Sequence, residues 1–214
     1  MLAEFLGMSV QVTLKAPSGT GGSRELQEGR LLEVSPQFCI LSGRTPKSRI
    51  VFGTSRVLEF QGVIPATLVF LVRNGQVLLA RKTRKVGKGR LTGYGGKIRS
   101  DETPEDAARR ELHEEAGVTA GLRLRPMGIV RLDNRGLEHH IHLFTLHEWE
   151  GKPRASKEMG KPMWFPQFDL PLHQMMRADA HWLPYILAGL PVEAKAAYGP
   201  KDQLIGPVTV KRIV

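Results

Sequence analysis

A loop crowded with glycines leads into a helix-forming segment, and this pair constrains the fold more than any other feature of the 214-residue chain. Five glycines lie between residues 86 and 97, where they permit backbone conformations and close ligand contacts that other residues resist. The next segment offers Thr103 as an N-cap, Pro104 at the first helical position and Gly117 as the residue that ends the helix. The sequence therefore predicts a loop–helix unit spanning residues 86–117.

Apolar segments on either side of this unit predict a sheet. Segments 67–72 and 76–81 flank the dipeptide Asn74-Gly75, which is typical of a tight β-hairpin. Further strands are expected at 127–132 and 141–149, with a final strand or two within 204–214. A second helix is expected around residues 181–188.

Residues 1–62 predict a separate, β-rich region. Short alternating or apolar segments are separated by Gly, Pro and polar turns, and they predict strands at 8–13, 29–34, 37–42, 48–52 and 56–60. So many short strands favour a small barrel, and a boundary is expected near residues 61–64. We therefore predict a small β-rich accessory domain at 1–62 and a larger domain at 63–214.

The chain is strongly basic, and the basic residues are unevenly placed. Lys and Arg number 31 against 21 Asp and Glu, which suggests an anionic partner without choosing between nucleotide, nucleic acid and anionic surface. Nine basic residues and no acid lie between Gln61 and Ser100, whereas the next 16 residues hold seven acids. A site for polyphosphate and its divalent cations needs such a pair of blocks, although two solvated faces that attract each other would look the same.

Other sequence features exclude some functional classes. The longest clean apolar run, 66–72, is far shorter than the roughly 20 residues of a membrane span, so no membrane partner is expected. The single cysteine, Cys39, excludes an internal disulfide and indicates a reducing compartment. The first ten residues do not resemble a secretory signal. We expect a cytoplasmic protein, with the nucleus and the mitochondrion as alternatives.

Three glutamates on the predicted helix are candidates for metal chemistry. Glu111, Glu114 and Glu115 are spaced i, i+3 and i+4, so they share one side of the helix, where like charges repel. A divalent cation would neutralise them, since carboxylate oxygens are preferred ligands of Mg²⁺. A solvated acidic face paired with Arg109 and Arg110 is the alternative. The glycine loop before the helix favours the metal, because its backbone groups can approach a polyphosphate.

The complete spacing is that of a known motif. Gly96, Glu102 and the segment 110–118 match every position of the Nudix box, G-x5-E-x7-R-E-U-x-E-E-x-G-U, where U is apolar. Residues 65–214 also resemble the MutT-related oxidised-purine nucleoside triphosphatases of the Nudix family. The resemblance implies an α+β fold, an α/β/α sandwich with a mixed sheet. It also implies Mg²⁺-dependent hydrolysis of oxidised purine nucleoside triphosphates, such as 8-oxo-dGTP, to monophosphate and pyrophosphate, which cleans the nucleotide pool.

The resemblance assigns roles to individual residues. Arg110 would orient the glutamates, and Glu102 would cap the loop. In the metal-assisted hydrolysis that follows, Glu114 or Glu115 could accept a proton from the attacking water or act only as a ligand. The ligands of Mg²⁺, with Mn²⁺ as the alternative, would be the carbonyl of Gly95 and the carboxylates of Glu111, Glu114, Glu115 and Glu158. The positions expected near the nucleotide are Thr67, Lys82, Thr92, Tyr94, Gly96, Lys97, Met176 and Asp179.

The expected base-recognition residues depart from the family pattern. Ala178 replaces one of two acidic residues, Met176 replaces a stacking tryptophan, and Thr92 replaces an asparagine. Asp179 remains, and it could bind a purine edge or cap a helix. Because losing a buried hydrogen-bonding partner shifts selectivity by orders of magnitude, these changes weaken the 8-oxo-dGTP assignment but not the reaction class.

Two further groups of side chains invite a functional interpretation. The histidines of segment 139–142 could bind a metal, but in a strand only His140 and His142 share a face and no fourth ligand is evident. Aromatic residues in segment 164–168 could stack on a base, although a place in the core is the expectation. The aromatic residues are Trp164, Phe165 and Phe168.

Two other functions stay open at this point. Hydrolysis of RNA caps or of other nucleoside-diphosphate derivatives is the first, and an RNA- or protein-binding adaptor is the second. Residues 1–62 faintly resemble Lsm/SH3-like barrels of mRNA-decapping scaffolds, which bind RNA or short protein motifs. An intact glutamate set argues against the adaptor, and the oligomeric state is not visible in the sequence.

Overall fold

The computed structural model divides the chain into two compact units. It describes residues 9–14, 25–34, 38–42, 49–53, 57–84, 86–121, 123–134 and 137–213. The first unit reaches to Ile64 and includes Leu137 and Glu138, and the second holds the remaining residues from Pro65 onward. Neither α-helix in the described part of the chain is long and apolar enough to cross a lipid bilayer.

The first unit consists of antiparallel strands. Strand β1 pairs with β2 and with the first part of β5, and β3 pairs with β2 and β4. The strands are β1 (Ser9–Leu14), β2 (Glu25–Val34), β3 (Phe38–Ser42), β4 (Arg49–Gly53) and β5 (Val57–Arg73). A separate barrel-like domain with a boundary at residue 62 stays a prediction.

The second unit is built on a mixed sheet. Its strands follow the order β14-β13-β9-β10-β5, while β6 pairs with β5, β7 and β12. Strand β13 runs parallel to β9, whereas β5–β6, β6–β12 and β13–β14 are antiparallel. The strands are β6 (Gln76–Arg81), β7 (Leu91–Thr92), β9 (Arg125–Asn134), β10 (Leu137–Leu146), β12 (Met163–Pro166), β13 (Val192–Tyr198) and β14 (Thr209–Arg212). A small second sheet pairs β8 (Thr119–Ala120) with β11 (Trp149–Glu150).

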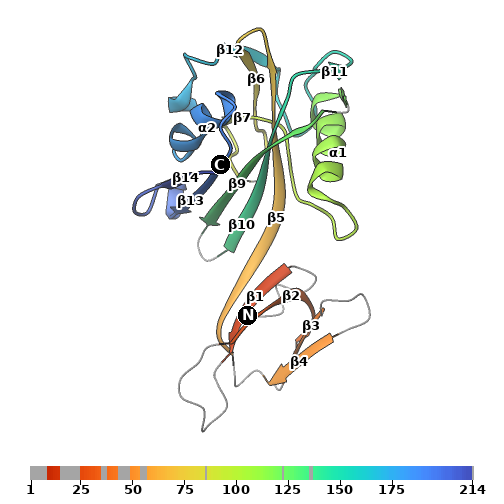
Figure 1. Ribbon diagram of the computed structural model, residues 1–214, viewed down its shortest axis with the longest axis vertical. Coiled ribbons are helices and arrows are strands. Elements are labelled where there is room, and N and C mark those ends of the chain that lie inside the picture. The colour runs from red at the N-terminus through yellow and green to blue at the C-terminus, as the bar shows by residue number, and fades with distance from the viewer. Residues whose placement is uncertain are drawn as a thin grey trace. The chain divides into compact units, whose positions relative to one another are not determined.

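Two helices pack against opposite faces of this sheet (Figure 1). Alternate residues of β5 face opposite sides, as the pleat of a strand requires. Val69 and Leu71 join a buried cluster with Leu112 of α1 (Pro104–Ala116). Phe70 joins a second cluster with Trp182 of α2 (Asp179–Leu187). The predicted α/β/α sandwich is therefore confirmed for this unit.

Local sequence chemistry accounts for the best-predicted elements. The hydroxyl of Thr103 accepts a hydrogen bond from the Asp106 amide at 3.1 Å, and Gly117 ends α1 at φ 71°. The hairpin turns at Asn74 and Gly75, which have φ values of 50° and 70°. Both predictions are confirmed.

The structure departs from the expected strands and aromatic positions in three places. Strand β5 is continuous through residues 57–73, where separate strands were expected. Strand β13 was not predicted, because most of its residues are alanine, glutamate or lysine. These residue types are depleted in β-strands. Phe165 packs against the core as expected, but Trp164 is exposed and Phe168 is 92% exposed.

Candidate active site

The glycine loop lies along β5 and turns its backbone toward α1. The Thr67 amide donates to the Gly96 carbonyl at 2.8 Å, and Val69 and Tyr94 exchange two backbone hydrogen bonds. A Cβ atom on Gly95 would overlap the Thr67 carbonyl oxygen, so this close approach requires glycine. The loop is therefore fixed to the sheet.

Glu115 is held at the inner side of this loop. It is 3% exposed, and its Oε2 accepts a hydrogen bond from the Gly95 amide at 2.8 Å. Its Oε1 lies 3.4 Å from Lys82 Nζ, which also donates to the Gly95 carbonyl oxygen at 3.2 Å. Burial raises the pKa of Glu115, and Lys82 and the Gly95 amide oppose that rise. Two of the predicted metal ligands thus face one cationic nitrogen.

Arg110 joins the loop to α1. Its Nη2 donates to Glu102 Oε2 at 2.8 Å and to the Lys97 carbonyl at 3.0 Å, and its Nη1 donates to Glu111 Oε1 at 2.6 Å. The hydrogen bond from Arg110 lowers the pKa of Glu102 to about 2, and the same pair raises the pKa of Arg110. These contacts are those expected of a residue that orients the glutamates and of a carboxylate that fixes the loop.

Glu114 lies at the outer side of the helix, where its side chain is 50% exposed. Its Oε1 lies 3.6 Å from Arg99 Nη2, and its Oε2 lies 3.4 Å from Arg110 Nη1. Arg99 belongs to the basic block seen in the sequence, but nothing in the sequence singled it out as a partner of Glu114. The structure adds Arg99 to the candidate site.

Backbone contacts place Glu158 next to the candidate site. Its carbonyl oxygen accepts a hydrogen bond from the Thr83 amide at 2.9 Å, and Met159 forms a β-bridge with Lys82. Glu158 therefore lies beside Lys82, the residue that follows the end of β6. Its role as a ligand stays a prediction.

The glutamate carboxylates of α1 do not converge on one point. Among the residues the structure describes, no three His, Cys, Asp or Glu side chains gather to hold a metal ion, and this includes the histidines of β10. Glu111, Glu114 and Glu115 each face a basic side chain instead. The charges of these carboxylates are thus neutralised from within the chain.

The donor set nevertheless fits a divalent cation. Its members are all oxygen atoms, as Mg²⁺ prefers. Gly95 O and Glu115 Oε1 already share a cationic neighbour, so their geometry accepts positive charge between them. A Cβ on Gly96 would lie 2.5 Å from Glu111 Oε1, so the glycine also leaves room for that carboxylate. Gly95, Glu111, Glu114 and Glu115 are the groups that would hold the ion.

Gly96→Ala is expected to lower the affinity for Mn²⁺ about tenfold, because the new methyl group displaces the Glu111 carboxylate. The thermal midpoint should fall only modestly, since the atoms that must move are the end of a side chain and not backbone, although the hydrogen bond from Arg110 is weakened. Calorimetric Mn²⁺ titration measures the effect. Gly199→Ala, whose Cβ would meet the flexible end of Ile205 at 3.0 Å, is the matched control. Equal affinities in both variants would contradict the role given to Gly96.

Asp179 is the buried acid of the predicted base-recognition segment. It is the first residue of α2, is 6% exposed, and its amide donates to the Met176 carbonyl at 2.9 Å. Burial raises the pKa of Asp179 to about 7. Ala178 occupies the N-cap position, so the alternative that Asp179 caps the helix is wrong.

The other predicted substrate residues lie in different surroundings. Thr67 and Tyr94 are buried, and their hydroxyl oxygens have no hydrogen-bond partner among the described residues. Burial raises the pKa of Tyr94, and nearby Glu115 adds to that rise. Half-buried Thr92 pairs with Ala80, and Lys97 is exposed. Contact of these residues with a substrate stays a prediction.

Sequence reasoning also missed Tyr198 of β13. Its hydroxyl accepts a hydrogen bond from the Ala178 amide at 2.8 Å, which ties β13 to the start of α2. Burial raises the pKa of Tyr198 to about 12, and nearby Asp179 contributes to the rise. The strand itself was missed, so no signal pointed to this tyrosine.

Comparison with known proteins decides the family. The NUDIX domain model matches residues 63–186, which is more than half of the chain. The chain belongs to the Nudix family. A relative from Danio rerio and one from Mus musculus, both called oxidized purine nucleoside triphosphate hydrolase, are 41% and 36% identical to it. Each match covers 56% of this chain and 78% of the relative.

The solved structures agree with the Nudix assignment. A mutator MutT protein from Bacillus halodurans is 26% identical and superposes with a TM-score of 0.59, covering 69% of this chain and 97% of its own. The chain is thus a Nudix pyrophosphohydrolase, and hydrolases of this family generally use divalent metal ions. The expectations of a Nudix fold and of an enzyme are confirmed.

Proposed function

We propose that this Nudix hydrolase cleaves purine nucleoside triphosphates, including oxidised ones, to nucleoside monophosphate and pyrophosphate with Mg²⁺. The observation that carries the reaction is the shared position between Gly95 O and Glu115 Oε1, at which a cation is already accepted. The purine triphosphate is supported by the two curated relatives, whose names state that substrate for those proteins.

The mechanism assigns separate tasks to the chain's own groups. When bound, Mg²⁺ neutralises phosphate oxygens and makes a bound water more acidic. The Gly95 amide and Arg110 hold Glu115 and Glu111 in place, so the carboxylates need little rearrangement. Glu114 is the exposed member of the set, so water reaches its carboxylate directly. Lys82 and Lys97 supply positive charge beside the polyphosphate.

Asp179 is proposed to bind the purine edge. Its pKa of about 7 keeps both the protonated and the ionised carboxyl populated near neutral pH, so the group can donate or accept a hydrogen bond. Ala178 supplies no second carboxyl beside it. We therefore expect weaker discrimination between 8-oxo-dGTP and dGTP than two acids would give.

A substrate panel tests the proposal. The full chain with Mg²⁺ is given 8-oxo-dGTP, 2-hydroxy-dATP, dGTP, capped RNA and a nucleoside-diphosphate sugar, and the products are separated by chromatography. Pyrophosphate release from the purine triphosphates is the expected result. Release of methylated GDP from capped RNA, with the triphosphates left intact, would overturn it in favour of cap hydrolysis.

A further inference from the structure

The residues that would hold the ion, Gly95, Glu111, Glu114 and Glu115, form the metal-binding set. Each glutamate of this set has a basic partner among the described residues. The three carboxylates are therefore neutralised by three cationic side chains, two arginines and one lysine. The pairs are Glu111 with Arg110 at 2.6 Å, Glu114 with Arg99 at 3.6 Å and Glu115 with Lys82 at 3.4 Å.

Arg110 is anchored independently of the metal-binding set. Its guanidinium also donates to Glu102 and to the Lys97 carbonyl, and neither of these groups belongs to the predicted metal ligands. Multiple charge-assisted hydrogen bonds hold such a planar group firmly. Arg110 is therefore expected to stay in place when a cation binds.

Lys82 is held differently. Among the residues that the structure describes, its ammonium group contacts Gly95 O at 3.2 Å and Glu115 Oε1 at 3.4 Å, and both oxygens belong to the predicted metal ligands. Lysine is a compact charge on a flexible stem, so it can leave one position without disturbing the backbone. The Lys82 ammonium thus occupies the place where those two oxygens meet.

The ion pair of Arg99 with Glu114 is weaker than the buried pair of Lys82 with Glu115. Its side chain is 59% exposed, and its distances to Glu114 and Glu102 are 3.6 and 3.9 Å. Exposed ion pairs of this kind contribute little to stability. The guanidinium can therefore turn into solvent at small cost.

We propose that divalent-cation binding at this site is a cation exchange, in which Lys82 leaves Gly95 and Glu115 and Arg99 leaves Glu114. Like charges repel strongly at such short separations, so the ammonium and a divalent ion cannot share the same two oxygens. In the absence of metal, Lys82 keeps the buried Glu115 from remaining unpaired, which would be strongly unfavourable. The exchange rests on the metal site of the proposed function and adds two residues that control its affinity.

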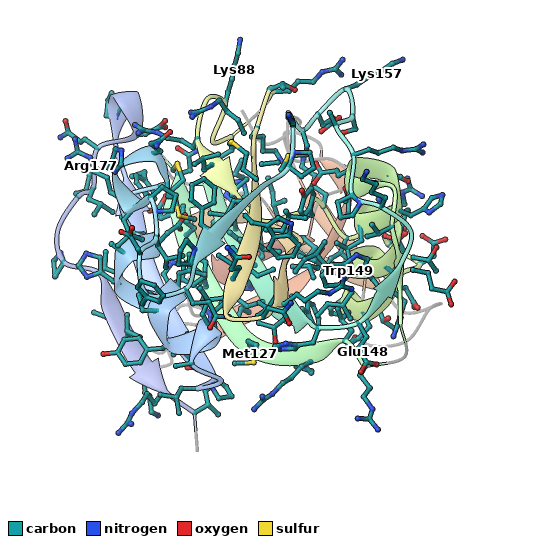
Figure 2. All side chains as sticks on the ribbon, turned by 90° about the horizontal axis from the view of Figure 1, so that it is seen from above. Lys88, Met127, Glu148, Trp149, Lys157 and Arg177 are labelled. Carbon is teal, nitrogen blue, oxygen red and sulfur yellow. The ribbon has the colours of Figure 1, made fainter. Side chains whose placement is uncertain are left out.

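Mn²⁺ binding to the full chain, without nucleotide, tests the exchange. Lys82→Met removes the competitor, and calorimetry at fixed ionic strength should show about tenfold tighter binding, equal to 1.4 kcal/mol. Thermal unfolding supplies a second readout: the variant should be less stable than the parent without Mn²⁺, and saturating Mn²⁺ should close that gap. Lys88→Met is the charge-matched control, because Lys88 extends from an exposed loop (Figure 2).

Arg99→Gln gives an independent arm in case Lys82→Met unfolds without metal. Because Arg99 is largely exposed, this variant should fold normally and bind Mn²⁺ about threefold more tightly than the parent chain. Affinities of Lys82→Met and Arg99→Gln equal to that of Lys88→Met, or weaker, would overturn the exchange. If Lys82→Met does not fold, parent-like affinity in Arg99→Gln overturns it alone. Since no nucleotide is present, these outcomes are separate from the result of the substrate panel.

Discussion

Replacing Glu115 with glutamine is expected to lower kcat for a purine nucleoside triphosphate by about 10² to 10⁴. Glutamine keeps the size of the side chain and an oxygen for the Gly95 amide, but it removes the negative charge. It also leaves the Lys82 ammonium beside a neutral group, where positive charge has lost its buried partner. Steady-state turnover with saturating Mg²⁺ measures the loss.

The companion variant and the control sharpen this experiment. Glu114→Gln removes the exposed carboxylate of the same set, and it should also reduce kcat strongly. Glu105→Gln changes an exposed acid in the first turn of α1, so it should leave turnover within about twofold of the parent while costing a few tenths of a kcal/mol in stability. Parent-like rates in both Glu114→Gln and Glu115→Gln would show that these carboxylates do not serve the reaction.

The parts of the fold that local chemistry dictates could be predicted from the sequence. Thr103 and Gly117 mark the two ends of α1, and Asn74-Gly75 marks the hairpin, because each acts through its own backbone neighbourhood. Strand β13 was missed because it pairs in parallel with β9, more than 50 residues earlier in the chain. Its buried Val192 and Ala194 alternate with exposed residues, but low strand propensity concealed that pattern.

The candidate site, like the fold, could be predicted from the sequence only in part. Helical spacing placed the glutamates on one side of α1, and the resemblance to the Nudix family placed Gly95 beside them. The ion pairs of Lys82 with Glu115 and of Arg99 with Glu114 depend on where the glycine loop meets the sheet, so no spacing rule could reveal them. Burial of Tyr94 likewise follows from packing of the loop against β5.

Asp179→Asn is expected to stabilise the chain at pH 8 while impairing its action on purines. The folded pKa of Asp179 is about 7 against an ordinary value of 3.8, so the folded chain keeps a proton that the unfolded chain has already released. The unfolding free energy therefore falls as the pH rises from about 4 to 7, and above that range the full cost of a buried carboxylate persists. Asparagine removes this cost, and the gain at pH 8 should reach up to about 4 kcal/mol, declining to nothing near pH 4.

Because Asp179 destabilises the fold at neutral pH, we expect it to serve the function of the protein. The Asp179→Asn variant also tests that function. If Asp179 binds the purine edge, Asp179→Asn should lower kcat/KM for purine triphosphates at least about tenfold and leave that for pyrimidine triphosphates unchanged. Urea unfolding at pH 4, 6 and 8 measures the first effect and steady-state kinetics the second, with exposed Asp169→Asn as the control. Unchanged stability at pH 8 would contradict the burial argument, whereas a gain in stability with unchanged purine selectivity would remove Asp179 from base recognition.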